Sequence, residues 1–386
     1  MPKRLVVCCD GTWNTPDQTS QGQSSPTNVT KVALSVAASA ADGTVQRLYY
    51  HPGVGVNRRT RLRGGVFGVG LSANIIDAYR FLVHEYEPGD ELFFFGFSRG
   101  AFTARSLVGL VRNSGILRVK NAGRVDEAYT LYRDRRAHPR GVAATLFRRS
   151  YAHEPRIRFV GVWDTVGALG IPDTGLGLPR LVNRRWQFHD TTLTSQVDAA
   201  FQALAIDETR RPFEPTLWQT PPHPADQVLE QVWFSGVHCD VGGGYSDTSQ
   251  SDIALAWLAG KAAGCGLAFT ADVFTASEPG RARPDESAFA MCPDPVGAIH
   301  QSRTRWYRLV RPYRRPIGQA DTDHEAVAST AIARRDGDAV YRPVNLHAYL
   351  DGPRPRIAEV RTGGGDAHRP DRRPRSAARR QPSDDG

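Results

Sequence analysis

One pentapeptide limits what this chain can fold into more than any other feature of the sequence. Residues 96–100 read GFSRG and lie between Glu91–Phe95, an apolar run typical of a buried strand, and Arg99–Val111, which has the apolar spacing of a helix. In the pattern G-x-S-x-G, a sharp strand-to-helix turn lifts the serine oxygen above a sheet, and the glycines let the strand and the helix approach each other. The positive end of the helix also favours a negative charge at this turn. The pentapeptide therefore predicts that Ser98 is a nucleophile.

The segments on either side of this turn alternate between strand-like and helix-like patterns. In chain order, the expected elements are a strand at Arg4–Cys9, a helix at Asn28–Ala41, a strand at Gln46–Tyr50, a helix at Leu71–Tyr86, a strand at Glu91–Phe95, a helix at Arg99–Val111, a strand at Ile157–Trp163, a helix at Asp198–Ile206, a strand at Gln231–Gly236 and a helix at Asp252–Ala263. Such alternation is typical of a parallel sheet that has helices on both faces. Together with the serine turn, it predicts an α/β fold of the α/β-hydrolase type, with a mostly parallel central sheet, helices on both faces, and helical and irregular insertions.

We expect one catalytic domain over residues 1–350, followed by a basic tail. Within the domain, the segment from about residue 121 to residue 151 looks like an arginine-rich helical insertion, and the segment from about residue 272 to residue 315 looks irregular. Residues 351–386 are rich in Pro, Gly, Arg and Asp and have little to bury, which predicts disorder. No apolar run approaches the ~18 residues that span a bilayer, and the first apolar run is too short for a signal peptide. We therefore expect a cytoplasmic protein, and delivery by a specialised secretion system stays open.

A serine nucleophile needs a histidine base and a carboxylate that orients this base. In α/β hydrolases the acid follows the serine, and the histidine follows the acid. Asp164 comes directly after the run Ile157–Trp163, and His238 follows the run Gln231–Gly236. Catalytic groups of open α/β sheets collect at the carboxyl ends of strands. Asp164 is therefore the predicted acid and His238 the predicted base, with Asp240 as the rival acid.

Stabilising an oxyanion requires N–H donors beside the nucleophile. We expect the first donor to be the amide of Arg99, the residue after the serine, and the second to be that of Gly11 or Thr12, which follow the first strand. Four further residues are candidates for substrate contact or loop support, namely Asp10, Asp240, Gly242 and Gly243.

Charge and cysteine content limit the other classes of function. The formal net charge is +9, but 45 of the 49 basic residues are arginine, so part of the excess reflects a compositional bias and nucleic-acid binding is not expected. The arginine-rich segments leave peripheral membrane contact open, beside a small-molecule or lipid ester as substrate. Five cysteines without zinc spacing fit a reduced protein. We predict neither a metal nor a cofactor, and the sequence does not indicate an oligomeric state.

Seven motifs occur in the order typical of one family: CDGTWN, NVTKV, HPGVGV, GFSRGAFTAR, VWDTVG, AIDETRRPFEPTLW and VHCDVGGGYSD. Over roughly residues 4–265, the chain resembles the α/β-hydrolase family that supplies the catalytic module of type VI secretion lipase effectors, many members of which are uncharacterised. The resemblance implies a Ser-Asp-His hydrolase, and the effectors act as phospholipases. Position by position, it implies Ser98 as the nucleophile, Asp164 as the acid and His238 as the base.

We expect a serine hydrolase that cleaves carboxylic esters, with lipid or phospholipid esters as the predicted substrates, through an acyl-enzyme on Ser98. Two alternatives stay open. A metal-dependent phosphoesterase would use Asp10, His238 and Asp240 as ligands. A hydrolase-fold interaction module would keep the motifs without turnover.

Overall fold

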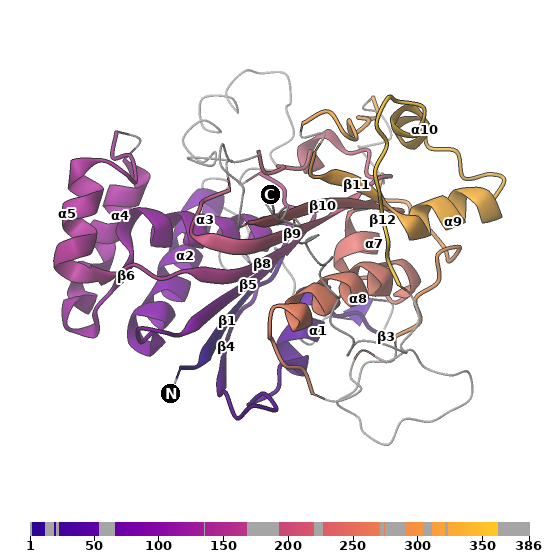
Figure 1. The fold of residues 1–386 in the computed structure, drawn as a ribbon. Coiled ribbons are helices and arrows are strands. Elements are labelled where there is room, and N and C mark those ends of the chain that lie inside the picture. Colours follow the sequence, from indigo (N-terminus) through magenta and orange to yellow (C-terminus); the bar gives the residue numbers. More distant parts are fainter. Residues whose placement is uncertain are drawn as a thin grey trace, which may run out of the picture.

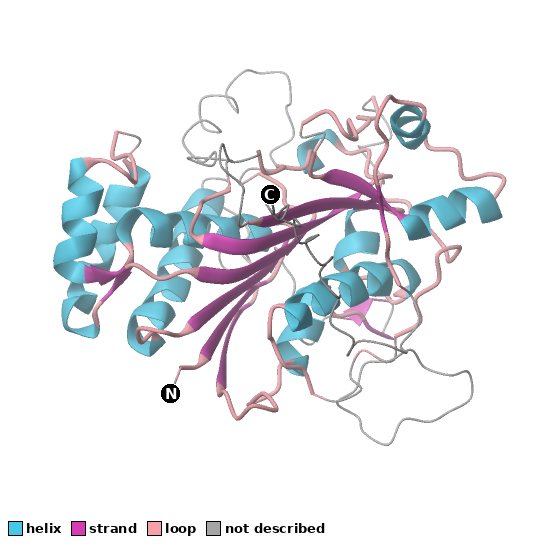
Figure 2. Cartoon of the chain, in the orientation of Figure 1, coloured by secondary structure: helices cyan, strands magenta, loops and turns pink. Residues whose placement is uncertain are grey.

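An eight-stranded sheet forms the centre of the computed structural model (Figure 1). Its strands lie in the order β12-β11-β10-β9-β8-β5-β1-β4, and each neighbouring pair in this described sheet is parallel. Helices lie on both sides of it (Figure 2), which confirms the predicted α/β fold. The structure describes residues 2–11, 19–20, 23–53, 66–134, 136–167, 193–219, 227–270, 274, 291–303, 311–320 and 323–361.

The bounds of the elements are as follows. The central sheet contains β1 Arg4–Cys9, β4 Gln46–His51, β5 Glu91–Phe97, β8 Ile157–Trp163, β9 Val197–Ala205, β10 Val228–Phe234, β11 Glu325–Ala328 and β12 Ile357–Ala358. Two short antiparallel pairs are β2 Thr19–Ser20 with β3 Gln23–Ser24, and β6 Ile116–Leu117 with β7 Ala152–His153. The helices are α1 Asn28–Ser35, α2 Val66–Glu85, α3 Arg99–Ser114, α4 Val125–Arg133, α5 Val142–Tyr151, α7 His238–Gly242, α8 Ser249–Gly264, α9 Ser329–Gly337 and α10 Val344–Leu350, with 3-10 turns η2 Val119–Arg124 and η3 Arg211–Phe213.

The sheet is buried on both faces, and successive residues of each strand pack into two different cores. Leu5 and Val7 of β1 pack with α2 and α3, whereas Val6 and Cys8 pack with α1 and α8. This division follows from the strand geometry, in which neighbouring side chains point to opposite faces. A strand covered on both sides is apolar throughout, which explains the continuous apolar run that predicts β1.

The register of the parallel strands brings several chain segments to one edge of the sheet. β1 lies between β4 and β5, with Cys9 opposite Gly96, and β8 pairs with β5 so that Phe97 lies opposite Trp163. The chain thus goes from β1 to one side of the sheet and later to the other, and the strand order reverses at β1. Open α/β sheets bind ligands outside the carboxyl ends of their strands at such a point. The serine turn after β5 lies there.

One of the predicted helices is wrong. The sequence predicts a helix at Asp198–Ile206, but the structure has strand β9 there, between β8 and β10. The segment is rich in alanine, which favours helices. In the sheet, Ala199 and Ala203 pack into the core beneath α8, while Ala200 packs into the opposite core. Burial on both faces therefore overrides the helix propensity.

The sheet continues past residue 350, where the sequence predicts that the disordered tail begins. Strand β12 pairs with β11, and Val360 is buried. A third core around Trp233, Ile317 and Leu346 joins β10 to the C-terminal segments. The sequence does not predict β12, because a strand of two residues gives no periodicity and the region around it is rich in arginine and proline. Residues 362–386 of the predicted tail lie outside the described residues.

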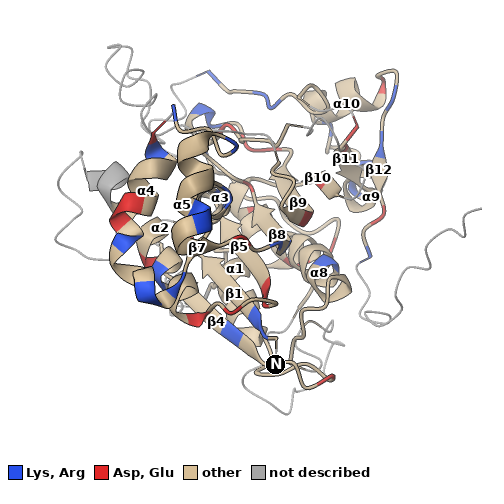
Figure 3. Cartoon of the chain, turned by 60° about the vertical axis from the view of Figure 1, so that its left-hand side comes forward, with Lys and Arg blue, Asp and Glu red and all other residues tan. Residues whose placement is uncertain are grey.

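The arginine-rich insertion is helical, as predicted, and packs against α2 and α3. Most of Asn121–Tyr151 forms η2, α4 and α5. Tyr132 of α4 packs against Gly109 of α3, and Arg148 of α5 donates to the carbonyl oxygen of Asn113 at 2.8 Å. In Figure 3, α4 has both acidic and basic positions, Asp126, Glu127 and Arg133, while α5 has Arg148, which is buried, and Arg149. Asn113 lies at the end of α3 away from the serine turn.

Two other expectations concern the irregular region and membrane-spanning segments. Of the irregular region 272–315, the described parts, 274, 291–303 and 311–315, contain no helix and no strand of the central sheet. Within the described ranges, no helix combines the length and the apolar character that crossing a membrane requires.

Candidate active site

Ser98 forms a strained turn between β5 and α3. β5 ends at Phe97 and α3 begins at Arg99, so one residue makes the turn. Its φ of 57° and ψ of −122° form a conformation that costs an L-residue on the order of 1–3 kcal/mol. Among the non-glycine residues that the structure describes, only Ser98 and Asp164 have positive φ. Such strain collects at functional sites, so the backbone singles out two of the residues that the sequence predicts.

Packing explains both glycines of the pentapeptide. A Cβ atom at Gly96 would lie 2.6 Å from the Cα atom of Ala101 in α3. A Cβ atom at Gly100 would overlap the carbonyl oxygens of Cys9 and Asp10 at the end of β1. Helix α3 therefore rests directly on the ends of β1 and β5, and this close approach keeps the turn sharp.

His238 and Asp164 meet at the same edge of the sheet. His238 is the first residue of α7, shortly after β10, and Asp164 directly follows β8. The Nδ1 atom of His238 lies 2.5 Å from Oδ2 of Asp164, and both side chains are buried. Phe97, the residue before the serine, packs on the His238 ring at a centroid distance of 4.6 Å, and Phe213 packs edge-on at 4.9 Å. Because Nδ1 of His238 is hydrogen-bonded to Asp164, Nε2 is the ring nitrogen that can take part in proton transfer.

Asp164 is also held by an arginine that the sequence does not predict for the site. Nη1 and Nη2 of Arg315 donate to the two carboxylate oxygens at 2.6 Å and 2.9 Å. The amide of Ala205 donates to Oδ1 at 3.1 Å. Burial raises the pKa of Asp164, but Arg315 and His238 outweigh it and hold the pKa well below its ordinary value. The carboxyl group is therefore an anion at neutral pH.

His238 is set up to be neutral at neutral pH. Burial lowers its pKa below the ordinary 6.5, and Asp164 opposes burial only in part. Two further charged residues lie close to the ring. Glu208 accepts a 3.4 Å hydrogen bond from the His238 amide, and Arg210 pairs with Glu208 at 2.7 Å. A neutral imidazole accepts a proton, which is what a general base must do.

The amides of Arg99 and Gly11, two of the predicted oxyanion donors, have different surroundings. Arg99 begins α3, so its amide lies at the N-terminus of this helix, next to Ser98. The amide of Gly11 instead donates to Oδ1 of Asp10 at 2.6 Å. Thr12 lies outside the described residues. Asp10 thus accepts a hydrogen bond from an amide that the sequence predicts as an oxyanion donor.

Asp10 joins the loops beside the serine turn. Its Oδ2 atom accepts hydrogen bonds from the hydroxyl groups of Thr27, Thr30 and Tyr50, at 2.7 Å, 2.8 Å and 2.8 Å. These bonds tie the end of β1 to the start of α1 and to β4. Asp10 is therefore placed for loop support.

Asp240 contacts a different histidine from the one that the sequence suggests. Its Oδ1 atom lies 2.6 Å from Nδ1 of His300, and its Oδ2 accepts from the amide of Val237 at 2.9 Å. Of the two candidate acids, Asp164 is the one that contacts the ring of His238. Asp240 instead closes the turn that carries His238.

Gly242 and Gly243 allow close packing at the end of α7. A Cβ atom at Gly242 would overlap the ring of Phe97. Gly243 has a φ of 82°, and a Cβ atom there would lie 2.7 Å from the amide nitrogen of Asn28. Both positions are accounted for by loop support, since α7 must approach β5 and α1.

The ligands of the metal alternative do not converge. In the described parts of the chain, no group of three or more His, Cys, Asp or Glu residues is arranged to hold a metal ion. The carboxylate of Asp10 accepts hydrogen bonds from hydroxyl groups, and that of Asp240 contacts His300. The structure therefore gives the metal-dependent phosphoesterase no site among these three residues.

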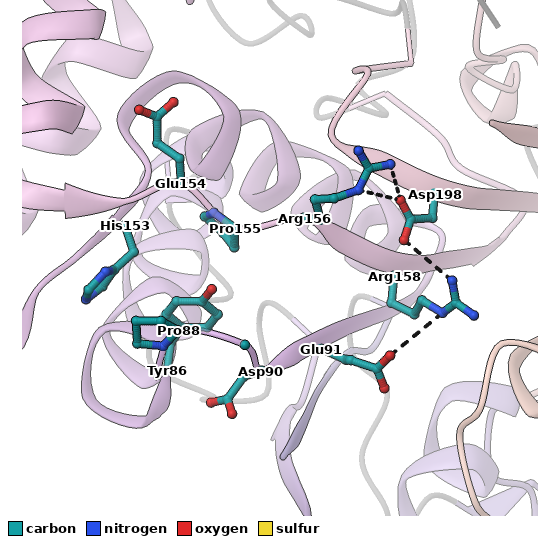
Figure 4. Close-up of a pocket in the computed structure, with 11 residues that line it drawn as sticks. Tyr86, Pro88, Asp90, Glu91, His153, Glu154, Pro155, Arg156, Arg158 and Asp198 are labelled. Atoms are coloured by element: carbon teal, nitrogen blue, oxygen red, sulfur yellow. Dashed lines mark hydrogen bonds and ion pairs between the residues drawn. The ribbon is translucent and has the colours of Figure 1, made fainter. Parts of the chain in front are cut away.

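A cavity of about 470 Å³ lies at the opposite edge of the sheet (Figure 4). Its lining includes Glu91, Arg158 and Asp198, which lie near the starts of β5, β8 and β9. Arg158 lies 3.9 Å from Glu91 and 3.6 Å from Asp198, and Arg156 donates to Asp198 at 2.9 Å. This cavity is separate from the serine turn, because it lies at the amino ends of the strands and Ser98 at a carboxyl end.

Comparison with known proteins identifies the family. Residues 3–261 match the family described as "T6SS, Phospholipase effector Tle1-like, catalytic domain". The chain belongs to this Tle1-like family.

Two further proteins are similar to this Tle1-like chain. An uncharacterized protein of Saccharomyces cerevisiae is 29% identical over 236 residues, which cover 55% of this chain and 32% of the yeast protein. The chain thus spans about a third of the length of that curated relative. The crystal structure of an uncharacterized protein from Pseudomonas aeruginosa has a TM-score of 0.47 and 18% sequence identity, covering 75% of this chain and 49% of the other.

Several residues around His238 are not among the predicted site residues. Glu208, Arg210 and Phe213 lie within the Tle1-like motif AIDETRRPFEPTLW, which is the signal that would have found them. Arg315 lies outside the matched region, in a segment rich in arginine and aromatic residues. No sequence signal separates it from its exposed neighbour Arg314.

Gly100 provides a test of the packing at the turn. Replacing a helical glycine with alanine normally stabilises a helix by about 1 kcal/mol. We expect Gly100→Ala to destabilise the protein instead, by about 1–3 kcal/mol, because the new Cβ atom meets the backbone of β1. The matched control is Gly260→Ala in α8, where nothing lies within 4 Å of the added atom. Thermal unfolding of both variants measures the difference, and equal effects of the two substitutions would contradict the close approach.

The two candidate acids are separated by a pair of isosteric substitutions. We expect Asp164→Asn to lower kcat for ester hydrolysis by roughly 10³- to 10⁴-fold, because an amide does not stabilise the imidazolium. Asp240→Asn should lower kcat much less, since Asp240 contacts His300. Steady-state kinetics on variants with confirmed native circular dichroism give the comparison. A larger loss in Asp240→Asn than in Asp164→Asn would reverse the assignment of the acid.

Proposed function

We propose that this protein is a serine hydrolase that cleaves carboxylic esters through an acyl-enzyme, with Ser98 as nucleophile, His238 as base and Asp164 as the acid that orients the base. The observation that carries the proposal is the strained backbone at Ser98 and Asp164, combined with the contact between Asp164 and His238. Membership of the Tle1-like family supports the same class of chemistry.

In the first half of the proposed reaction, Nε2 of His238 takes the hydroxyl proton of Ser98 while Oγ attacks the ester carbonyl carbon. Asp164 holds Nδ1 and stabilises the imidazolium that forms. The amide of Arg99, at the start of α3, is the proposed donor to the oxyanion. The imidazolium then protonates the departing alcohol, and the acyl group stays on Ser98.

In the second half, water replaces the alcohol. His238 removes a proton from the water, and the resulting hydroxide attacks the acyl-enzyme carbonyl. When the tetrahedral intermediate collapses, the proton returns to Oγ of Ser98 and the carboxylic acid leaves. This sequence is redox-neutral and uses side chains of this chain together with water.

Lipid or phospholipid esters are the proposed substrate class. This finer assignment is supported by the family, whose description names a phospholipase effector.

The direct test of the proposed function is ester turnover. We expect purified protein to hydrolyse p-nitrophenyl esters or a phospholipid, and Ser98→Ala to lower kcat by roughly 10⁶-fold, because no other group replaces the nucleophile and only transition-state binding remains. Ser106→Ala is the matched control, since Ser106 is a buried serine on the same helix α3. A series of acyl chain lengths measures whether the enzyme prefers short esters or lipids.

Two results would overturn the proposal. Turnover in Ser98→Ala that stays close to the wild-type kcat would move the nucleophile elsewhere. A wild-type protein that is folded and inert toward the whole series, under conditions in which a control lipase is active, would favour the interaction module without turnover.

A further inference from the structure

We propose that Arg315 is a positioning residue of this active site, which locks the Asp164 carboxylate in the orientation that serves His238. The inference rests on the proposed function, because it gives Arg315 a part in the same reaction. It goes beyond the family match, since Arg315 lies outside residues 3–261.

The first step of the argument is the geometry of the carboxylate. Arg315 donates to both oxygens of Asp164, at 2.6 Å and 2.9 Å, while His238 contacts Oδ2 alone. The planar fork of a guanidinium matches the two oxygens of a carboxylate and fixes its plane. A carboxylate held by a single histidine would turn more freely, because the terminal torsion of aspartate is broad.

The second step is that Arg315 is itself held in place. Its Nη1 and Nη2 atoms also donate to the carbonyl oxygens of Ala205 and Phe213, at 2.9 Å and 2.5 Å. Its own carbonyl oxygen accepts from Nδ2 of Asn345 in α10 at 3.3 Å. Two residues later, Ile317 is buried in the third core. The arginine is therefore fixed at both ends, which a residue that positions another group must be.

The third step concerns what the ion pair does for the protein. Both side chains of the Arg315–Asp164 pair are completely buried. Buried ion pairs are often no more stabilising than apolar residues of similar shape, so stability alone is a weak reason for this pair. Moreover, Nε of Arg315 has no hydrogen-bond partner within the described structure. The pair sits on the carboxylate that contacts His238, which points to a role in the site.

The consequence for the chain is that its C-terminal part completes the active site. The segment that carries Arg315 is anchored by α10 and by the core between β10 and β11. The part of the chain that matches the family would thus need this later segment to hold its acid in place.

The positive charge of Arg315 also affects the pKa of His238. The charged groups that face His238 are Asp164 and Arg315 from one side, and Glu208 and Arg210 from the other. The guanidinium of Arg315, which is paired with Asp164, disfavours a second positive charge on the ring of His238. Removing Arg315 should therefore raise the pKa of His238, and the acid limb of kcat/KM should move to higher pH.

The experiment compares Arg315→Met, Arg315→Lys and the control Arg148→Met in the full chain. Arg148 is a buried arginine that pairs with Glu154, far from the serine turn at the other end of α3. We expect Arg315→Met to lose about 10²-fold in kcat with little change in KM, as for a displaced catalytic group, and its acid limb to shift upward. Arg315→Lys keeps the charge without the fork, so it should lose kcat while its acid limb stays near that of the wild type.

The control variant separates positioning from stability. Arg148→Met should lower the unfolding temperature without moving the acid limb. If Arg315→Met folds and keeps the wild-type kcat and acid limb, or if it changes both no more than Arg148→Met does, Arg315 is a structural residue and the proposal is overturned. If Arg315→Met does not fold, Arg315→Lys decides by the same comparison of kcat.

A second measurement keeps this inference separate from the proposed function. The Nδ1 proton of His238, bound to Asp164, should give a far-downfield proton NMR resonance in the wild type. We expect Arg315→Met to lose or shift that resonance and Arg148→Met to retain it. An inert wild-type enzyme would refute the proposed function, whereas an unchanged resonance in Arg315→Met would refute the positioning role.

Discussion

A buried negative charge is the constraint on which the rest of this site depends. Asp164 is completely buried, and an ionised carboxylate in a protein interior is costly unless charged and polar groups surround it. His238, Arg315 and the amide of Ala205 meet this need. These partners come from the segments after β10, before β11 and in β9, so the whole C-terminal half of the sheet must be assembled before the carboxylate has its donors.

Packing links Ser98, the proposed nucleophile, to His238, the proposed base, through one phenylalanine. Phe97 ends β5 directly before Ser98, and its ring packs on the ring of His238. Gly242 at the end of α7 has no side chain that would displace this ring. The strained turn at Ser98 is thereby held by α3 on one side and by His238 on the other. Strain of this size persists only where the surrounding structure determines it several times over.

The predicted residues Ser98, Asp164 and His238 share a local signal, which is an apolar run that stops at a polar residue. Such a run marks a strand end, and in a parallel sheet all strand ends of one kind lie at one edge, so the location of these three residues at one edge of the sheet follows from sequence. The contacts themselves are tertiary. The segment of β9 is rich in alanine and reads as a helix until the strands on either side are known. The pairing of Arg315 with Asp164 joins residues 151 positions apart, and no periodicity predicts it.

The central claim is that Ser98 is the nucleophile of a hydrolase whose base is His238. Mass spectrometric mapping of the protein after reaction with a fluorophosphonate tests this claim most directly, because the reagent forms a stable adduct with an activated serine. The account predicts one adduct, on the peptide that contains Ser98, whose rate of formation falls as His238 becomes protonated at low pH. An adduct on another serine, or a folded protein that forms none, would contradict the account.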